Sequence, residues 1–190
     1  MPITKPGERK QQILEVLAEM LEKPAPEKIT TAALAARLDV SEAALYRHFA
    51  SKAQMFEGLI EFIETTLFTL VNKIAAETPG GAAQAQQIVS VLLGFAEKNP
   101  GMTRVLIGDA LVNEDERLQA RINQVYDRIE AALRQSLRIA HAAGAWPGDP
   151  AADAGVLLAF VLGRLQLYAK SGFKRLPQEG WELQRKFLFG

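Results

Sequence analysis

Apolar residues recur at helical spacing along most of the chain. The helix patterns are shortest, and lie closest together, between Ile29 and Lys52. Two helix patterns lie in this stretch, and only Asp39–Val40 separates them. Thr30 and Ser41 stand where the two helices begin, and each can accept a hydrogen bond from an amide that a helix start leaves unpaired. The apolar faces that can pack together consist of Leu34, Ala35 and Leu38 in one helix and Leu45 and Phe49 in the other. The stretch therefore predicts a helix-turn-helix with its second helix presented outward.

The remaining apolar patterns predict an all-α protein of about nine helices. Besides the two of the hairpin, we expect helices over residues 8–22, 52–76, 84–98, 100–111, 114–143, from 150 onward, and from Pro177. The organisation that follows is an N-terminal helix-turn-helix domain over residues 1–52 and a C-terminal helical domain over residues 53–190.

Four polar residues mark helix starts after the hairpin. Ser51 with Gln54 forms a capping-box sequence, so a long helix is expected to follow the outward helix directly. Asn99 can cap a helix that has Pro100 at its first position. Asn113, followed by three acids, is expected to cap the next long helix, and Asp149 the one after it.

The long helix after Ser51 carries one apolar stripe that faces the core. At 100° per residue the stripe centres on Phe56, Leu59, Ile63, Leu67, Leu70 and Ile74. Phe62 and Phe68 fall off that centre. Each is expected either to pack under a neighbouring helix or to line a groove for a partner.

The last two helices predict a homodimer interface. The run from Ala154 to Gly163 is apolar nearly all round, which is too much for one face to bury inside a small body. Small residues in it would let another helix approach closely, and the final helix adds large apolar side chains. The candidate interface residues are Gly155, Ala159, Phe160, Gly163, Trp181 and Phe187. A helix buried within its own chain is the alternative.

Composition narrows the class of protein. The chain has 190 residues, 48% of them hydrophobic, no cysteine and a net charge of zero. Around the hairpin four cations (Lys28, Arg37, Arg47 and Lys52) stand against two acids (Asp39 and Glu42), so the surplus positive charge is local. The first ten residues lack the apolar run of a signal peptide, and no later segment resembles an uncharged membrane span, so we expect a cytoplasmic protein without a membrane span.

No constellation of residues indicates catalysis. His48 lies in the hairpin and His141 stands alone near a helix end, so neither has the spacing of a metal ligand set. The sequence holds no glycine-rich phosphate loop and no nucleophile elbow. We therefore expect no enzyme activity, no metal and no cofactor.

The outward face of the second hairpin helix holds Ala43, Tyr46, Arg47 and His48, with Lys52 just beyond. Small, hydrogen-bonding and cationic groups suit a DNA groove flanked by phosphates, although two cations alone fit a solvated face better. The run from Val40 to Lys52 resembles the DNA-binding signature of TetR-type regulators, with Ala43 where glycine is commonest. The resemblance implies a homodimer on double-stranded palindromic DNA, with contacts from Thr31, Ser41, Glu42, Ala43, Tyr46, Arg47, His48 and Lys52.

A narrower resemblance covers residues 10–138. The segments 29–32, 41–49, 59–64, 92–95, 99–106 and 118–124 resemble the nucleoid occlusion factors of this family, which stay with the nucleoid. That likeness implies binding of the C-terminal tail of the tubulin-like division protein FtsZ, in a groove between the fourth and fifth helices. The matching positions are Phe62, Val91, Gly94, Lys98 and Asn99. Leu70 departs, because relatives carry arginine there.

The sequence therefore leaves two alternative functions. The first is an adaptor that ties specific DNA to inhibition of Z-ring assembly. The second is a repressor that responds to a small molecule in a cavity within residues 85–165. A large enclosed cavity favours the sensor, whereas a filled core with an open groove favours the adaptor.

Overall fold

The computed structural model describes residues 6–23 and 29–190, so Lys28 lies outside it. Within these residues the chain forms nine α-helices and one 3-10 helix, with no strand, which confirms the all-α prediction. The helices are α1 (Pro6–Leu21), α2 (Thr31–Arg37), α3 (Glu42–Tyr46), α4 (Lys52–Glu77), α5 (Gly81–Lys98), α6 (Pro100–Leu106), η1 (Asp109–Leu111), α7 (Glu116–Ala142), α8 (Pro150–Lys170) and α9 (Trp181–Phe189).

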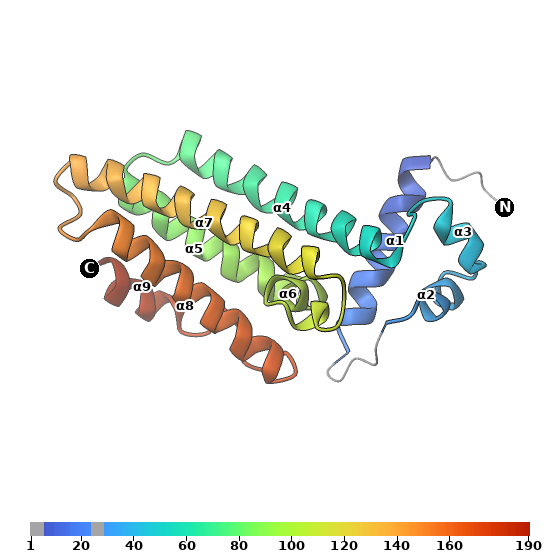
Figure 1. Cartoon of the computed structure of the whole chain (residues 1–190). Helices are drawn as coiled ribbons and strands as arrows, with labels where there is room; N and C mark the ends of the chain where they lie inside the picture. Colours follow the sequence, from blue (N-terminus) through green and yellow to red (C-terminus); the bar gives the residue numbers. More distant parts are fainter. Residues whose placement is uncertain (1–5, 24–28) are drawn as a thin grey trace.

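The helices form an elongated bundle with a small head at one end (Figure 1). Helices α1, α2 and α3 make the head, and α4 runs from it along α5 and α7. Helix α8 packs on α5 and α7, and the C-terminus lies at the end of the bundle far from α2 and α3. The division predicted at residue 52 stays a prediction, because α1 packs on both α4 and α6 of the body.

Four predicted helix caps are present. Oxygens of Thr30, Ser41 and Ser51 accept hydrogen bonds from the amides three residues later, at 3.1, 3.3 and 3.2 Å. Asp149 accepts from two amides at 2.8 and 2.7 Å. These local signals were sufficient because each cap needs only an extended residue directly before the first turn.

Two predicted asparagine caps are wrong. Asn113 has φ +65°, which is not the extended backbone of a cap, and Asp115 caps α7 instead by accepting from the Arg117 amide at 3.1 Å. Asn99 makes no side-chain cap for α6. The side-chain amide of Asn99 instead donates to the Phe95 carbonyl at 2.7 Å. It therefore pairs a carbonyl at the end of α5 and not an amide at the start of α6.

Some helix bounds also differ from prediction. Helix α5 begins three residues early, at Gly81, and the helix predicted over 100–111 divides at Gly108, which has φ +78°, into α6 and η1. Helix α9 begins at Trp181 and not at Pro177. Arg164 donates to the carbonyls of Leu176, Pro177 and Glu179 at 2.9, 3.0 and 2.6 Å, which holds that segment as a turn.

The apolar stripe of α4 is mostly buried, with one exception. Phe56, Leu59, Ile63, Leu67 and Ile74 are 0–8% exposed, whereas Leu70 is 38% exposed, so its predicted place in the core is wrong. Of the two off-stripe phenylalanines, Phe68 is buried and Phe62 is 41% exposed. One has therefore packed under α7, and the other remains available to a partner.

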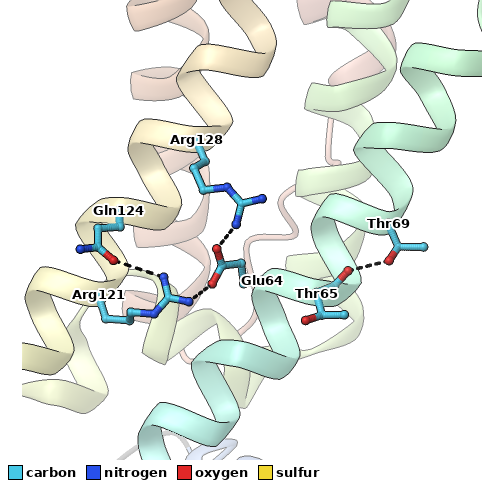
Figure 2. Close-up of polar contacts among 6 residues, drawn as sticks. All are labelled: Glu64, Thr65, Thr69, Arg121, Gln124 and Arg128. Atoms are coloured by element: carbon cyan, nitrogen blue, oxygen red, sulfur yellow. Dashed lines mark hydrogen bonds and ion pairs between the residues drawn. The ribbon is translucent and has the colours of Figure 1, made fainter.

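A buried carboxylate joins α4 to α7. Glu64 of α4 is 6% exposed and accepts hydrogen bonds from the guanidinium groups of Arg121 and Arg128 (Figure 2). The guanidinium carbon of Arg128 also lies 3.9 Å from the ring centroid of Phe68. The side chains of Arg121 and Arg128 are 38% and 53% exposed, and both bind the acid that α4 buries, which fixes how α4 lies on α7.

Candidate nucleic-acid interface and partner groove

The hairpin in the head has the geometry of a helix-turn-helix. Leu34, Ala35, Leu45 and Phe49 are buried between α2, α3 and the helices behind them. The turn is closed by backbone bonds from Asp39 to Ala36 and from Val40 to Ala35. Asp39 has φ +54°, a conformation that aspartate tolerates better than most residues.

The predicted DNA-contacting residues are all at least partly accessible to solvent. Ser41, Glu42, Ala43, Tyr46 and Arg47 are exposed, and Thr31, His48 and Lys52 are partly exposed. Tyr46, at 45%, is a large apolar side chain left open to solvent at the end of α3. Arg47 follows α3 as its C-cap, so the helix is shorter than the sequence pattern indicated.

Two of these residues contact each other. The Thr31 hydroxyl donates to a carboxylate oxygen of Glu42 at 2.5 Å, which joins the first turn of α2 to the first turn of α3. This bond orients the two helices, and it occupies the hydroxyl proton of Thr31.

Lys52 has a partner in the body of the protein. Its ammonium lies 2.5 Å from a carboxylate oxygen of Glu114, in the loop before α7, and 5.6 Å from the ring centroid of Phe56. The side chains of Lys52 and Glu114 are 22% and 13% exposed. The phosphate contact expected for Lys52 stays a prediction, and a phosphate would compete with Glu114 for the same ammonium.

A groove of about 350 Å³ lies between α4 and α5, and we call it the α4–α5 groove. Its lining residues are Leu70, Ser90, Val91, Gly94, Phe95, Lys98, Asn99 and Gln178. Four of the five predicted partner-binding residues thus lie together: Val91, Gly94, Lys98 and Asn99. The structure also places Leu70 in this groove, at the position where the resemblance led us to expect arginine.

The fifth residue, Phe62, lies elsewhere. It lines a separate hollow of about 160 Å³ between α1, α4 and α6, together with Gln11, Leu14, Glu15, Leu59 and Met102, and we call it the α1 hollow. Phe62 precedes Leu70 by two turns of α4, so it lies about 12 Å further along the helix, towards the head.

Gln178 forms part of the groove wall that sequence reasoning missed. A Cβ on Gly94 would lie 3.1 Å from the Gln178 amide nitrogen, so glycine leaves room for that side chain. The Gln178 backbone amide donates to Glu97 at 3.1 Å, and Arg164 binds the carbonyls on either side of it. Only the tertiary fold brings this residue to α5, since no local pattern in the sequence marks it.

The predicted dimerisation residues fall into two groups. On α8, Ala159 and Gly163 are exposed and Gly155 and Phe160 partly exposed, and Val156 beside them is 57% exposed. On α9, Phe187 is 89% exposed, whereas Trp181 is only 5% exposed. Trp181 packs inside the chain, with its ring centroid 6.0 Å from that of Phe160, so it supports the surface from behind.

Helix α8 is the one helix in the described part of the chain that is long and apolar enough to cross a membrane by length and composition. The sequence reasoning did not foresee such a candidate. One face of α8 packs in the core through Ala154, Leu157, Val161 and Leu165, which are 0–3% exposed. The opposite face carries the exposed small residues named above.

No cluster of three or more potential metal ligands occurs within residues 6–23 and 29–190. His141 lies beside the Trp146 carbonyl, with its Nδ1 at 3.0 Å from that oxygen. His48 lies on the hairpin surface. The two histidines are therefore in different parts of the molecule.

Comparison with known proteins relates both halves of the chain to bacterial regulators. Residues 13–59 match the family described as bacterial regulatory proteins, tetR family, and residues 82–190 match the family described as tetracyclin repressor-like, C-terminal domain. Among solved structures, the MbdR regulator from Azoarcus sp. superposes with a TM-score of 0.81 at 17% identity, covering 95% of this chain and 96% of that one. This likeness establishes the fold.

Two proteins related by sequence share a higher identity with this chain than that structure does. The nucleoid occlusion factor SlmA of Marinomonas sp. is 52% identical over 182 residues, which cover 95% of this chain and 92% of the relative. The SlmA of Alteromonas mediterranea is 49% identical over 186 residues, covering 97% and 95%.

Proposed function

The chain belongs to the TetR family of bacterial regulatory proteins and, within it, to the nucleoid occlusion factors called SlmA, and from this premise we propose that it is a sequence-specific DNA-binding homodimer that receives the C-terminal tail of FtsZ and antagonises Z-ring assembly over the chromosome. Proteins of this family are DNA-binding regulators that act as dimers. We place the protein in the cytoplasm, on the nucleoid.

The observation that carries the FtsZ proposal is the α4–α5 groove. Val91, Gly94, Lys98 and Asn99 come from one helix and its C-cap, and together they line an open surface of suitable size for an extended peptide. The Gln178 side chain covers Gly94, so a peptide backbone approaches α5 at Gly94 when that side chain moves aside, and the exposed Lys98 suits an acidic segment.

The interior of the body supports the adaptor over the ligand sensor. Between α5, α7 and α8 the core is filled by side chains that are 0–4% exposed: Ile88, Leu92, Val125, Leu157 and Val161. The body has a hollow of about 390 Å³ between α4 and α7 and one of about 370 Å³ beside Tyr126 and Gly163, and both are open to solvent. An enclosed apolar cavity of several hundred cubic ångströms would favour a small-molecule ligand instead.

The proposal is tested by binding a fluorescent FtsZ-tail peptide to the DNA-bound dimer and measuring anisotropy. Lys98→Glu should weaken peptide binding at least tenfold and leave operator affinity near wild type. Arg138→Glu, the same charge reversal at an exposed position of α7, is the matched control and should bind the peptide normally. Unchanged peptide affinity in both variants contradicts the groove assignment.

The DNA half is tested separately with an operator fragment. Tyr46→Ala should lower DNA affinity while peptide affinity persists, because Tyr46 lies in the head and far from the groove. Tyrosine is uncharged, so the slope of log K against log salt should stay near that of wild type, whereas loss of a cationic phosphate contact would flatten it by about 0.9. If Tyr46→Ala binds operator DNA with wild-type affinity, α3 is not part of the DNA interface.

A further inference from the structure

The Gln178 side chain lies across part of the α4–α5 groove. Its amide nitrogen donates a hydrogen bond to the Ser90 carbonyl oxygen of α5 at 3.4 Å. A Cβ on Gly94 would lie 3.1 Å from the same nitrogen. All three residues line the groove. The side chain therefore occupies space that a partner segment needs in order to reach α5.

Gly94 is the reason that the Ser90 carbonyl is accessible from the groove. Side chains on an α-helix tilt towards its N-terminus, so a side chain at position 94 would cover the turn that contains Ser90. Glycine leaves that turn open. Besides the bond it accepts within the helix, the carbonyl oxygen has a second lone pair, and the Gln178 amide is the donor that occupies it.

The backbone of Gln178 is fixed from two directions. Its own amide donates to a carboxylate oxygen of Glu97 on α5 at 3.1 Å. Arg164 of α8 donates to the carbonyls of the residues on either side, Pro177 at 3.0 Å and Glu179 at 2.6 Å. These bonds hold the chain at position 178 beside α5 without using its side chain.

The side chain of Gln178 is held much less firmly than its backbone. The residue is exposed, and the bond to Ser90 is the one hydrogen bond of this side chain within residues 6–23 and 29–190. At 3.4 Å that bond is longer than an ordinary hydrogen bond, and water can replace it at small cost. A rotation of the side chain therefore opens the groove at Gly94 without any movement of the backbone.

A partner that displaces this side chain must also replace its hydrogen bond. If a partner covered the Ser90 carbonyl without offering a donor, the second lone pair of that oxygen would be cut off from water and left unpaired. An extended peptide carries backbone N–H groups that its own chain leaves free. One such N–H group, lying over Gly94, can take the place of the Gln178 amide.

We propose that Gln178 is a removable cover, whose amide occupies the Ser90 carbonyl in the free protein and gives way to a backbone N–H group of the partner segment. This inference rests on the proposed function and adds an autoinhibitory contact to it. The cover lowers the observed affinity by the fraction of molecules in which the groove is open. It also favours a partner that replaces the hydrogen bond over one that only fills the groove.

The test uses the full-length dimer on operator DNA and the fluorescent FtsZ-tail peptide. Gln178→Ala should bind the peptide about two- to fivefold more tightly, because the groove at Gly94 is then open in every molecule. A side chain that supported the groove or contacted the peptide would give weaker binding on removal. Gln178→Asn, whose amide is one methylene short of Ser90, should bind as Gln178→Ala does.

Gln135→Ala is the matched control. It makes the same change at an exposed position of α7 and should bind the peptide as wild type does. Operator affinity and the thermal transition should be the same in all of these variants, which confirms that they fold.

A second arm identifies the incoming donor. Single backbone amides along the peptide are replaced by esters, which keep the shape of the chain and cannot donate. At one position the ester should weaken binding to wild type and to Gln178→Ala by about threefold or more. The same ester should have little further effect on Gly94→Ala, whose methyl group covers the Ser90 carbonyl, and such non-additivity indicates a direct contact.

The outcomes separate this inference from the proposed function. Unchanged or weaker peptide binding in Gln178→Ala, together with weaker binding in Lys98→Glu, overturns the cover and leaves the groove standing. A peptide without an ester-sensitive position overturns the exchange of donors at Ser90. Wild-type affinity in Lys98→Glu overturns the groove assignment, and the cover with it.

Discussion

The ammonium of Lys52 lies 2.5 Å from the carboxylate of Glu114, and this ion pair joins the first residue of α4 to the loop before α7. Lys52 closes the DNA-binding signature, and Glu114 belongs to the body. The pair is largely shielded from solvent, so it is less screened by salt than an exposed pair.

Glu114→Gln should strengthen operator binding several-fold at low salt. The substitution removes the carboxylate that competes with phosphate for Lys52, and it should steepen the salt dependence by about 0.9 for each protomer whose Lys52 then binds a phosphate. Affinity measured against salt concentration checks this. Glu116→Gln, an equal charge change at an exposed position of α7, should behave as wild type. Weaker binding by Glu114→Gln would mean that the pair serves to orient the head.

Leu70→Arg should strengthen binding of an acidic FtsZ-tail peptide. Leu70 is exposed in the α4–α5 groove, so an arginine there can point into the groove without disturbing the core. We expect a gain of about 1 kcal/mol or less, the usual size for an exposed ion pair, and it should disappear at high salt. Leu70→Gln adds a polar side chain without charge and is the control. Equal affinities of the two variants would deny an electrostatic contribution.

Val156→Arg should weaken the dimer. Val156 is 57% exposed between Gly155 and Ala159, on the face of α8 that we assign to the partner protomer. A buried, unpaired charge at such an interface costs several kcal/mol, so the dissociation constant should rise at least tenfold. Sedimentation equilibrium measures it. Ala75→Arg, at an exposed site on α4, should leave the dimer intact, and a dimer that survives Val156→Arg places the interface elsewhere.

Alkaline pH should destabilise the protein through Tyr126. Burial raises the pKa of Tyr126 to about 12 from its ordinary value of 10. Between these two values the unfolded chain releases the proton while the folded chain retains it, so the free energy of unfolding falls as pH rises, by about 2–3 kcal/mol across the whole window. Tyr126→Phe should lose this contribution and keep only the smaller one of Tyr168, whose pKa burial also raises. Urea unfolding of both proteins between about pH 9 and 12 measures the difference, and parallel curves would exclude Tyr126 as its source.

Local signals predicted most of the fold, and their failures share a physical cause. Thr30, Ser41, Ser51 and Asp149 cap as expected because a cap depends on its own turn. Asn99 does not cap α6 because it lies between two helices, and its side chain binds a carbonyl at the end of α5. The choice between competing helix ends is made by geometry that a sequence pattern does not contain.

The groove was predicted only in part for a similar reason. The positions on α5 share one helix face, and the resemblance identified them. Phe62 and Gln178 depend on where α1 and the segment before α9 pack, and these contacts link residues far apart in the chain. The core position predicted for Leu70 is wrong because helical periodicity alone does not reveal which flank of a stripe a neighbouring helix covers.

Gly101 determines how closely the head approaches the body. A Cβ at this position would lie 1.9 Å from the Ala18 carbonyl oxygen, so α1 and α6 meet through backbone, with no side chain between them. When two helices pack through side chains, the distance between them changes with the size of those side chains. When they pack through backbone atoms, the distance does not depend on side-chain size. In a dimer, the separation of the two α3 helices must match the repeat of the DNA helix. Because Gly101 has no Cβ, backbone contact sets the distance between α1 and α6. That distance in turn helps to set the separation of the two α3 helices in a dimer.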